Sequence, residues 1–222
     1  MKRRFKYFAG IFALCLSSAV EAQSPIEKMF VSMPDAYYLS LSSEMRNKML
    51  SAYISDSTST MKNRFRGESS IQLLDREQQL VVVKNSAQGT VEIKALQRND
   101  SIVQIAVIFT ACAPACDSHI GFFGSNWQIL AHTLMPSPAI TDFLNTEKIL
   151  ADGKQVNDIV ERFDIIFLQA TFAGQGNNIE VTLNSKKFLE KEQYEALKPY
   201  LKGSKLLYEW RNNAFEKSSC YW

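Results

Sequence analysis

Residues 80–111 read LVVVKNSAQGTVEIKALQRNDSIVQIAVIFTA, which is three apolar runs separated by two short polar breaks. The breaks contain Gln88-Gly89 and Arg98-Asn99-Asp100, and both have the composition of tight turns. Parallel strands need a connection of about a dozen residues or more, so runs this close together must pair antiparallel. The stretch therefore predicts the centre of an antiparallel meander.

The middle run of this stretch has a period of two. Its members Val91, Ile93 and Ala95 alternate with Glu92, Lys94 and Leu96. This pattern is typical of a sheet with one face mostly buried. The flanking runs at 80–83 and 102–111 are almost continuously apolar, as in central strands. We expect about five strands between residues 70 and 131.

A helix is predicted before the meander. Leu41, Met45, Met49 and Ala52 recur at helical spacing, and Ser42 or Ser43 can cap the start. The helix is expected to end by Ser55. The polar run that follows, 55–60, predicts an exposed connection.

A smaller unit follows the break Pro136-Ser137-Pro138. Residues 140–162 are expected to be helical or irregular, and 165–172 with 179–183 to form a hairpin. A helix over 188–201, with Gly203 as its cap, and a closing strand over 206–210 complete the unit. The fold class is therefore α+β: an antiparallel sheet meander with a helix before it, then a smaller helix/hairpin/helix/strand unit. Residues 23–222 are expected to be one domain, with subdomains of about 23–135 and 136–222.

Residues 1–22 have the pattern of a secretory signal peptide. Four cations precede an apolar run over 7–16, and Val20-Glu21-Ala22 offers a cleavage site. Cleavage after Ala22 would change the net charge from +2 to −1. Charge therefore favours neither nucleic acid nor a membrane surface as a partner. We expect an exported protein in the periplasm or cell envelope, with no transmembrane segment in the mature chain and a monomeric state.

Three cysteines remain after the leader: Cys112, Cys116 and Cys220. In an oxidising compartment, the close pair Cys112 and Cys116 predicts a disulfide. Cys220 can bridge to either of them, pair between molecules or stay free.

The segment around these cysteines also allows other chemistries. A thiol enzyme would use Cys112 and Cys116, although three intervening residues is not the usual spacing. Zinc could be held by the two cysteines with His119 and His132. A Ser118 triad is excluded if the segment is extended, because Ser118 then faces away from Asp117 and His119. We expect neither a metal nor another cofactor, and no catalytic residue is assigned.

Three residues are candidates for ligand binding. Asp117 and His119 share one face of an extended segment. Trp127, beyond Phe122-Phe123, suggests a ligand pocket, although aromatic residues in strands more often belong to the core.

The order of several short motifs resembles a family of exported Bacteroidetes proteins, the domain-of-unknown-function family 3256. These motifs are Met33-Pro34-Asp35, the helix with Leu41, Arg46 and Tyr53, Asn63 before Ser70-Ile71, the strand ending at Thr110, and Pro114, Asp117-Ser118, Phe122-Phe123 and Trp127. The resemblance implies an α+β fold and an envelope location, and it brings no catalytic residues. In such a bacterium, Ser57 and Ser101 would be candidate O-glycosylation sites, because Asp56-Ser57-Thr58 and Asp100-Ser101-Ile102 match the motif used there.

Two hypotheses for the function remain. The first is a non-catalytic protein of the periplasm or envelope that binds another envelope protein or a small ligand. The second is a thiol- or metal-dependent enzyme built on Cys112, Cys116 and His119. The reactivity of the two thiols would separate them.

Overall fold

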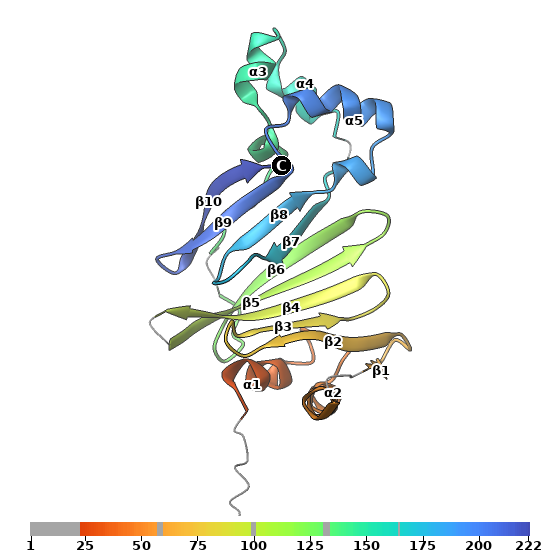
Figure 1. Ribbon diagram of the computed structural model, residues 1–222, viewed down its shortest axis with the longest axis vertical. Coiled ribbons are helices and arrows are strands. Elements are labelled where there is room, and N and C mark those ends of the chain that lie inside the picture. Colours follow the sequence, from red (N-terminus) through yellow and green to blue (C-terminus); the bar gives the residue numbers. More distant parts are fainter. Residues whose placement is uncertain (1–22, 57–59, 99–100, 131–133, 164) are drawn as a thin grey trace, which may run out of the picture.

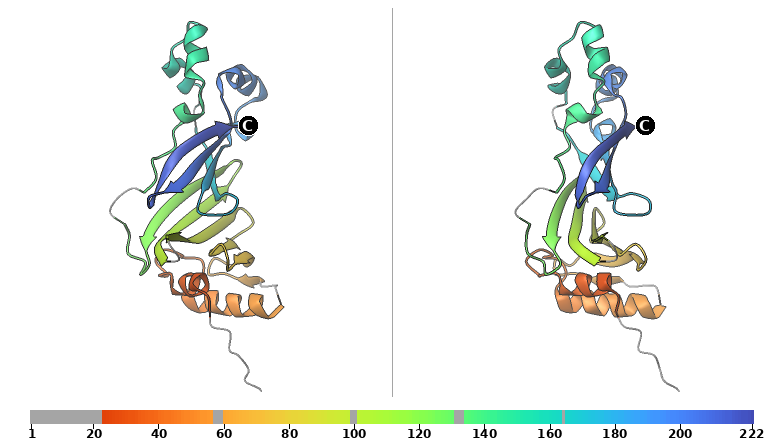
Figure 2. Two further views of the ribbon diagram at one scale, coloured as in Figure 1. Left: turned by 60° about the vertical axis from the view of Figure 1, so that its left-hand side comes forward. Right: turned by 90° about the vertical axis from the view of Figure 1, so that its left-hand side faces the viewer.

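The computed structural model describes residues 23–56, 60–98, 101–130, 134–163 and 165–222. These residues form layers along the long axis of the molecule (Figure 1). Two N-terminal helices lie at one end, a six-stranded and a four-stranded sheet follow, and short helices lie at the other end (Figure 2). Among the described residues, no helix is long and apolar enough to cross a membrane.

The first sheet is the predicted meander. Each strand pairs antiparallel with the next one in the sequence. The five strands expected between residues 70 and 131 are present, and a sixth strand precedes them because the short segment after residue 59 also pairs. The strands are β1 (Thr60–Lys62), β2 (Glu68–Asp75), β3 (Leu80–Lys84), β4 (Gly89–Arg98), β5 (Ser101–Cys112) and β6 (Cys116–Gly124).

The second sheet has the order β10-β9-β8-β7 and is also antiparallel. The expected hairpin and closing strand are present, but β10 was not predicted. Asn212 and Asn213 join β9 to β10 with φ values of 50° and 63°. A two-residue turn of this kind needs positive φ at both positions, which asparagine tolerates, so Asn-Asn was an available signal. The strands are β7 (Leu168–Phe172), β8 (Ile179–Leu183), β9 (Lys205–Arg211) and β10 (Ala214–Tyr221).

Short helices complete the second half, where longer ones were expected. The predicted helix over 188–201 is divided, and Gly203 does not cap it. A side chain at Gly203 would lie 2.5 Å from the Tyr221 carbonyl oxygen, so glycine permits the close approach of β10. The helices are η1 (Ile140–Phe143), α3 (Thr146–Ala151), α4 (Val156–Val160), η2 (Ser185–Lys187), α5 (Lys191–Leu197) and η3 (Lys198–Tyr200).

Two helices precede the first sheet, α1 (Pro25–Ser32) and α2 (Ser43–Asp56). Only α2 was predicted, and the Ser42 hydroxyl accepts from the Met45 N–H as expected of a cap. The missed α1 begins with Ser24-Pro25-Ile26-Glu27, in which the Ser24 N–H donates to the Glu27 carboxylate. Serine three residues before glutamate, with proline first in the helix, is a known helix start.

The buried side of α2 differs from the predicted stripe. Met49 is buried as expected, but Ala52 is exposed, and Arg46 and Leu50 are buried instead. The burial of Arg46 was not predicted, because a charged side chain is usually exposed to solvent. Its guanidinium is buried against carbonyl groups around the end of α1, which supply the acceptors that water would otherwise provide.

Both faces of the first sheet are covered. Val91, Ile93 and Ala95 belong to a core shared with α1 and α2. On the opposite face, Leu96, Ala106 and Ile108 pack against the second sheet. The expectation of one mostly buried face was therefore wrong for β4, since Glu92 and Lys94 are buried too.

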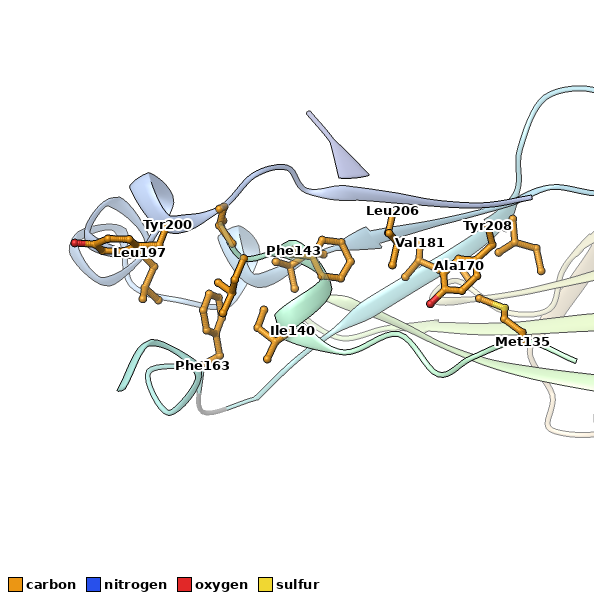
Figure 3. Packing of buried hydrophobic residues seen from close by; sticks show 14 of the residues in the cluster. Met135, Ile140, Phe143, Phe163, Ala170, Val181, Leu197, Tyr200, Leu206 and Tyr208 are labelled. Atoms are coloured by element: carbon orange, nitrogen blue, oxygen red, sulfur yellow. The ribbon is translucent and has the colours of Figure 1, made fainter. Parts of the chain in front are cut away.

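The second core runs from the first sheet to the terminal helices. Met135, Ile140 and Phe143 come from the segment before α3, and they lie against side chains of the second sheet (Figure 3). Ile159 of α4 and Phe163 just after this helix are buried in the same core. The two halves therefore share apolar contacts across the sheet-to-sheet interface.

Candidate functional site

The outer edge of β6 is the starting point of the candidate site. β6 is the last strand of its sheet, and β7 is the last strand of the other. The Cys112 N–H donates to the Gln88 carbonyl, on the side of β4. The backbone of Cys112 thus faces β4, and its partner Cys116 on β6 turns its own N–H and C=O away from β5. Backbone direction alternates along a strand, so the N–H and C=O groups of Ser118, Ile120 and Phe122 also point away from β5.

Both ends of this outer edge are occupied. Asn184 Nδ2 donates to the Cys116 carbonyl (2.9 Å), and the Leu130 N–H donates to the Phe122 carbonyl (3.3 Å). Between these contacts, none of the described strands pairs with the outer edge of β6. Among the described residues, the outward N–H and C=O groups of Ser118 and Ile120 thus have no backbone partner, and they form an open strand edge.

β7 lies beside β6 in Figure 1 but does not close this edge. Its N–H groups at every second residue donate to side chains of the first sheet. These bonds run from Leu168 N to Asp117 Oδ1 (2.9 Å), Ala170 N to Ser118 Oγ (2.9 Å) and Phe172 N to Glu92 Oε2 (3.0 Å). Since Glu92 lies on β4, β7 crosses the face of the first sheet and does not pair with β6.

A groove of about 520 Å³ follows the open edge. Residues 117–122 form one wall, parts of β7 and β8 form another, and residues 129–130 with 135–138 complete it. Most of the lining is apolar, and the described lining residues include Asp117 but no lysine or arginine. The apolar side chains are Ile120, Phe122, Ile129, Leu130, Met135 and Leu168, among others.

Asp117 and His119, which the sequence analysis named as candidates for ligand binding, both line this groove. Ser118 lies between them, and its hydroxyl is 2.8 Å from Thr110 Oγ1 in addition to accepting from Ala170. Ser118 thus has a structural hydrogen-bond network of its own, away from His119. The open edge itself was not predicted, because it depends on where β7 lies.

Trp127 does not line the groove. It is 5% exposed and belongs to the core with α1 and α2. Its ring is 5.3 Å from that of Phe123, and its Nε1 donates to Ser32 Oγ (3.2 Å). The structure therefore separates Trp127 from Asp117 and His119.

Cys112 and Cys116 form the expected disulfide across the turn between β5 and β6. Cys220 is free and partly buried, and burial raises the pKa of its thiol. Within the part of the chain that the structure describes, no three His, Cys, Asp or Glu side chains gather as metal ligands would. The thiol and metal alternatives gain no support from this geometry.

Three further residues were candidates in the sequence: His132, Ser57 and Ser101. His132 and Ser57 lie outside the described residues. Ser101 is the first residue of β5, where its backbone pairs with Arg98. The glycosylation hypothesis for the two serines stays a prediction.

Glu92 and Lys94 are buried between the two sheets, close to the groove. Thr171 Oγ1 donates to Glu92, and Lys94 Nζ donates to the Gln78 carbonyl (2.7 Å) and lies over the Phe172 ring. Burial raises the pKa of Glu92 and lowers the pKa of Lys94 to about 8. The contact between the sheets therefore contains two ionisable groups whose charged forms are both destabilised by burial.

The burial of Lys94 predicts a stability that rises with pH. Its folded-state pKa of about 8 is below the ordinary 10.5, so between these values the unfolded chain binds the proton more tightly. From pH 7.5 to 9.5, the free energy of unfolding of the wild type should gain about 2 kcal/mol relative to Lys94→Met. Urea titrations of both proteins at both pH values measure this difference. An equal pH dependence in the variant would contradict the assignment.

The family can be assigned from the sequence match. The model of a family described as a protein of unknown function, DUF3256, matches residues 17–215. The chain belongs to DUF3256. No curated protein matches the sequence.

The DUF3256 chain is also similar to a solved structure, that of a domain of an uncharacterized protein from Porphyromonas gingivalis W83. The two are 21% identical, with a TM-score of 0.74 over 88% of this chain and 100% of the other. This likeness shows a shared fold and agrees with the Bacteroidetes resemblance of the sequence. The roles of residues in this DUF3256 member must be argued from its own structure.

Proposed function

We propose that this protein is exported to the periplasm or cell envelope and is a non-catalytic binding protein whose ligand occupies the groove beside β6. The groove carries the proposal. Its volume of about 520 Å³ is within the range of ligand sites, which are mostly apolar with a few polar groups that orient the ligand. The leader pattern of residues 1–22 supports export.

The hydrogen bonds at the groove support binding over catalysis. Asp117 Oδ1 accepts from the Leu168 N–H, and Ser118 Oγ contacts both Thr110 and the Ala170 N–H. These side chains hold β7 in place, whereas a nucleophile or general base needs a free contact with its substrate. His119 remains exposed at the groove and can contact a ligand directly.

Photo-crosslinking from the groove tests this proposal. Ile129 lines the groove and is 68% exposed, so benzoylphenylalanine at this position would contact a bound ligand. Phe65 is equally exposed at 69% and lies in the turn between β1 and β2, outside the groove lining. We expect a discrete adduct from position 129 and none from position 65, after irradiation of Bacteroidetes cells that express the full chain.

The same cells test export. Mass spectrometry of the protein released from the periplasm should find Gln23 as the first residue. Adducts of equal yield from both positions would contradict a ligand site in the groove. Retention of residues 1–22 on a cytoplasmic protein would contradict the envelope location.

A further inference from the structure

We propose that the ligand of the groove is an extended peptide segment of another protein, which adds to the open edge of β6 as a further strand. This inference rests on the proposed function of the groove and names the class of its partner. It follows from the backbone groups that line the groove, from their surroundings and from the charge at one end.

The backbone of β6 supplies a hydrogen-bonding pattern that an extended peptide matches. Ser118 and Ile120 each turn one N–H and one C=O outward, and Phe122 adds an N–H. Donors and acceptors at this repeat pair with another strand, which is how peptides add to the edge of a sheet. A compact small molecule would satisfy only part of this row.

The open stretch has defined ends. Asn184 occupies the Cys116 carbonyl at one end, and Leu130 occupies the Phe122 carbonyl at the other. The five residues from Ser118 to Phe122 extend over about 16 Å, which suits a peptide of about five residues. Longer pairing would require Asn184 or Leu130 to leave β6.

The walls of the groove favour apolar residues at alternate positions of the peptide. Side chains of an added strand point alternately to the two faces of the sheet. On one face, Leu168 and Ala170 of β7 lie beside β6. Ile129 and Leu130 line the groove beyond Phe122.

Charge favours a basic residue at one end of the peptide. Asp117 lies at the Ser118 end of the open edge and is exposed, and no lysine or arginine is among the described lining residues. A lysine or arginine of the peptide would pair with Asp117, whereas an acidic residue would be repelled. The expected partner therefore has a short segment of alternating apolar residues next to a basic residue.

The position of β7 keeps the edge available. Asp117, Ser118 and Glu92 accept the N–H groups that β7 would otherwise direct to a neighbouring strand. β7 is therefore satisfied without pairing to β6, and the peptide need not displace it.

Fluorescence anisotropy with synthetic peptides tests the inference. The probes are fluorescein-labelled Lys-Lys-Thr-Val-Thr-Val-Thr and Thr-Val-Thr-Val-Thr-Lys-Lys, which place the basic pair at either end. Each is compared with a version N-methylated at alternate residues and with a version that has glutamate in place of lysine. We expect one unmodified peptide to bind, and both kinds of modification to weaken its binding at least tenfold.

A proline on β6 provides the matching change in the protein. Ile120→Pro removes an outward N–H that makes no bond to β5, and proline is tolerated at such an edge position. Ser218→Pro is the control, because Ser218 is exposed in the bulge of β10, another edge strand, away from the groove. Ile120→Pro should weaken peptide binding at least tenfold, and Ser218→Pro should leave it unchanged.

The outcomes separate this inference from the proposed function. Strand addition would be overturned if methylated and unmethylated peptides bind equally, or if neither peptide binds at 1 mM, a concentration that corresponds to a binding free energy of only about 4 kcal/mol. Both results are measured on the wild type, so they hold even if Ile120→Pro fails to fold. If adducts from position 129 persist in that case, the groove binds a different ligand and the proposed function stands. If position 129 gives no adduct and neither peptide binds, both the strand addition and the proposed binding function of the groove are contradicted.

Discussion

Replacement of Arg46 by methionine should lower the free energy of unfolding by about 3–5 kcal/mol. The Arg46 side chain is fully buried, and its guanidinium donates to backbone carbonyls around the end of α1. Methionine fills similar space but leaves these carbonyls without donors in a site that water does not reach. The carbonyls belong to Phe30 (2.8 Å), Val31 (3.2 Å), Met33 and Leu41.

Urea unfolding at pH 7 measures the loss, and Arg64→Met is the matched control. Arg46 also contacts the Asp35 carboxylate at 3.4 Å, and Arg64 pairs with this carboxylate at 2.9 Å, but the Arg64 and Asp35 side chains are both partly exposed. Exposed ion pairs contribute about 1 kcal/mol or less, so the control should be nearly neutral. Arg46→Lys should be intermediate, because an ammonium group reaches fewer carbonyls at once. A loss below 1 kcal/mol for Arg46→Met would contradict the role assigned to the guanidinium.

Trp127→Ala should also lower the free energy of unfolding by about 3–5 kcal/mol. The indole is buried among residues of α1, the first sheet and the turn after β6. Alanine would leave a cavity beside Phe123 and remove the hydrogen bond from Nε1 to Ser32. This result would identify Trp127 as a core residue, in contrast to its sequence interpretation as a binding candidate.

Trp222→Ala is the control for this variant, because Trp222 is 59% exposed. Its free energy of unfolding should change by about 0.5 kcal/mol or less. Peptide anisotropy on both variants, at a temperature where each is folded, separates stability from binding. A stable Trp127→Ala that fails to bind the peptides would return Trp127 to the binding site.

The meander could be predicted because its information is local. Gln88-Gly89 and the polar break near residue 99 leave only antiparallel pairing for residues 80–111. The ends of the fold were harder, although their signals were local too. The start of α1 at Ser24-Pro25-Ile26-Glu27 and the Asn212-Asn213 turn before β10 are both short motifs within weakly patterned sequence.

The burial of Glu92 and Lys94 could not be predicted from their own strand. A charged residue at every second position normally indicates a solvent face. These positions are buried because β7, about eighty residues later, places Thr171 and Phe172 over them. The sequence of β4 itself does not indicate that β7 packs across this face.

The candidate site was predictable only in part. Alternation along β6 correctly separated Ser118 from Asp117 and His119, since it follows from strand geometry alone. The open edge depends on the path of β7 and on residues 128–130, which fold back against the end of β6. The position of Trp127 depends on the same segment: the turn after Gly124 gives Trp127 a φ of 66°, and its side chain is buried in the core with α1 and α2.

The hydrogen bonds from β7 to side chains also bear on self-association. Unpaired strand edges are sites where copies of a protein can join into extended sheets. Here the N–H groups of β7 are already occupied by Asp117, Ser118 and Glu92, and the open stretch of β6 lies in a groove between walls. These walls restrict the approach of another folded sheet more than that of a single extended peptide, because the peptide is narrower. The molecule can thus keep the outer edge of β6 available for the proposed peptide while it resists aggregation through this edge.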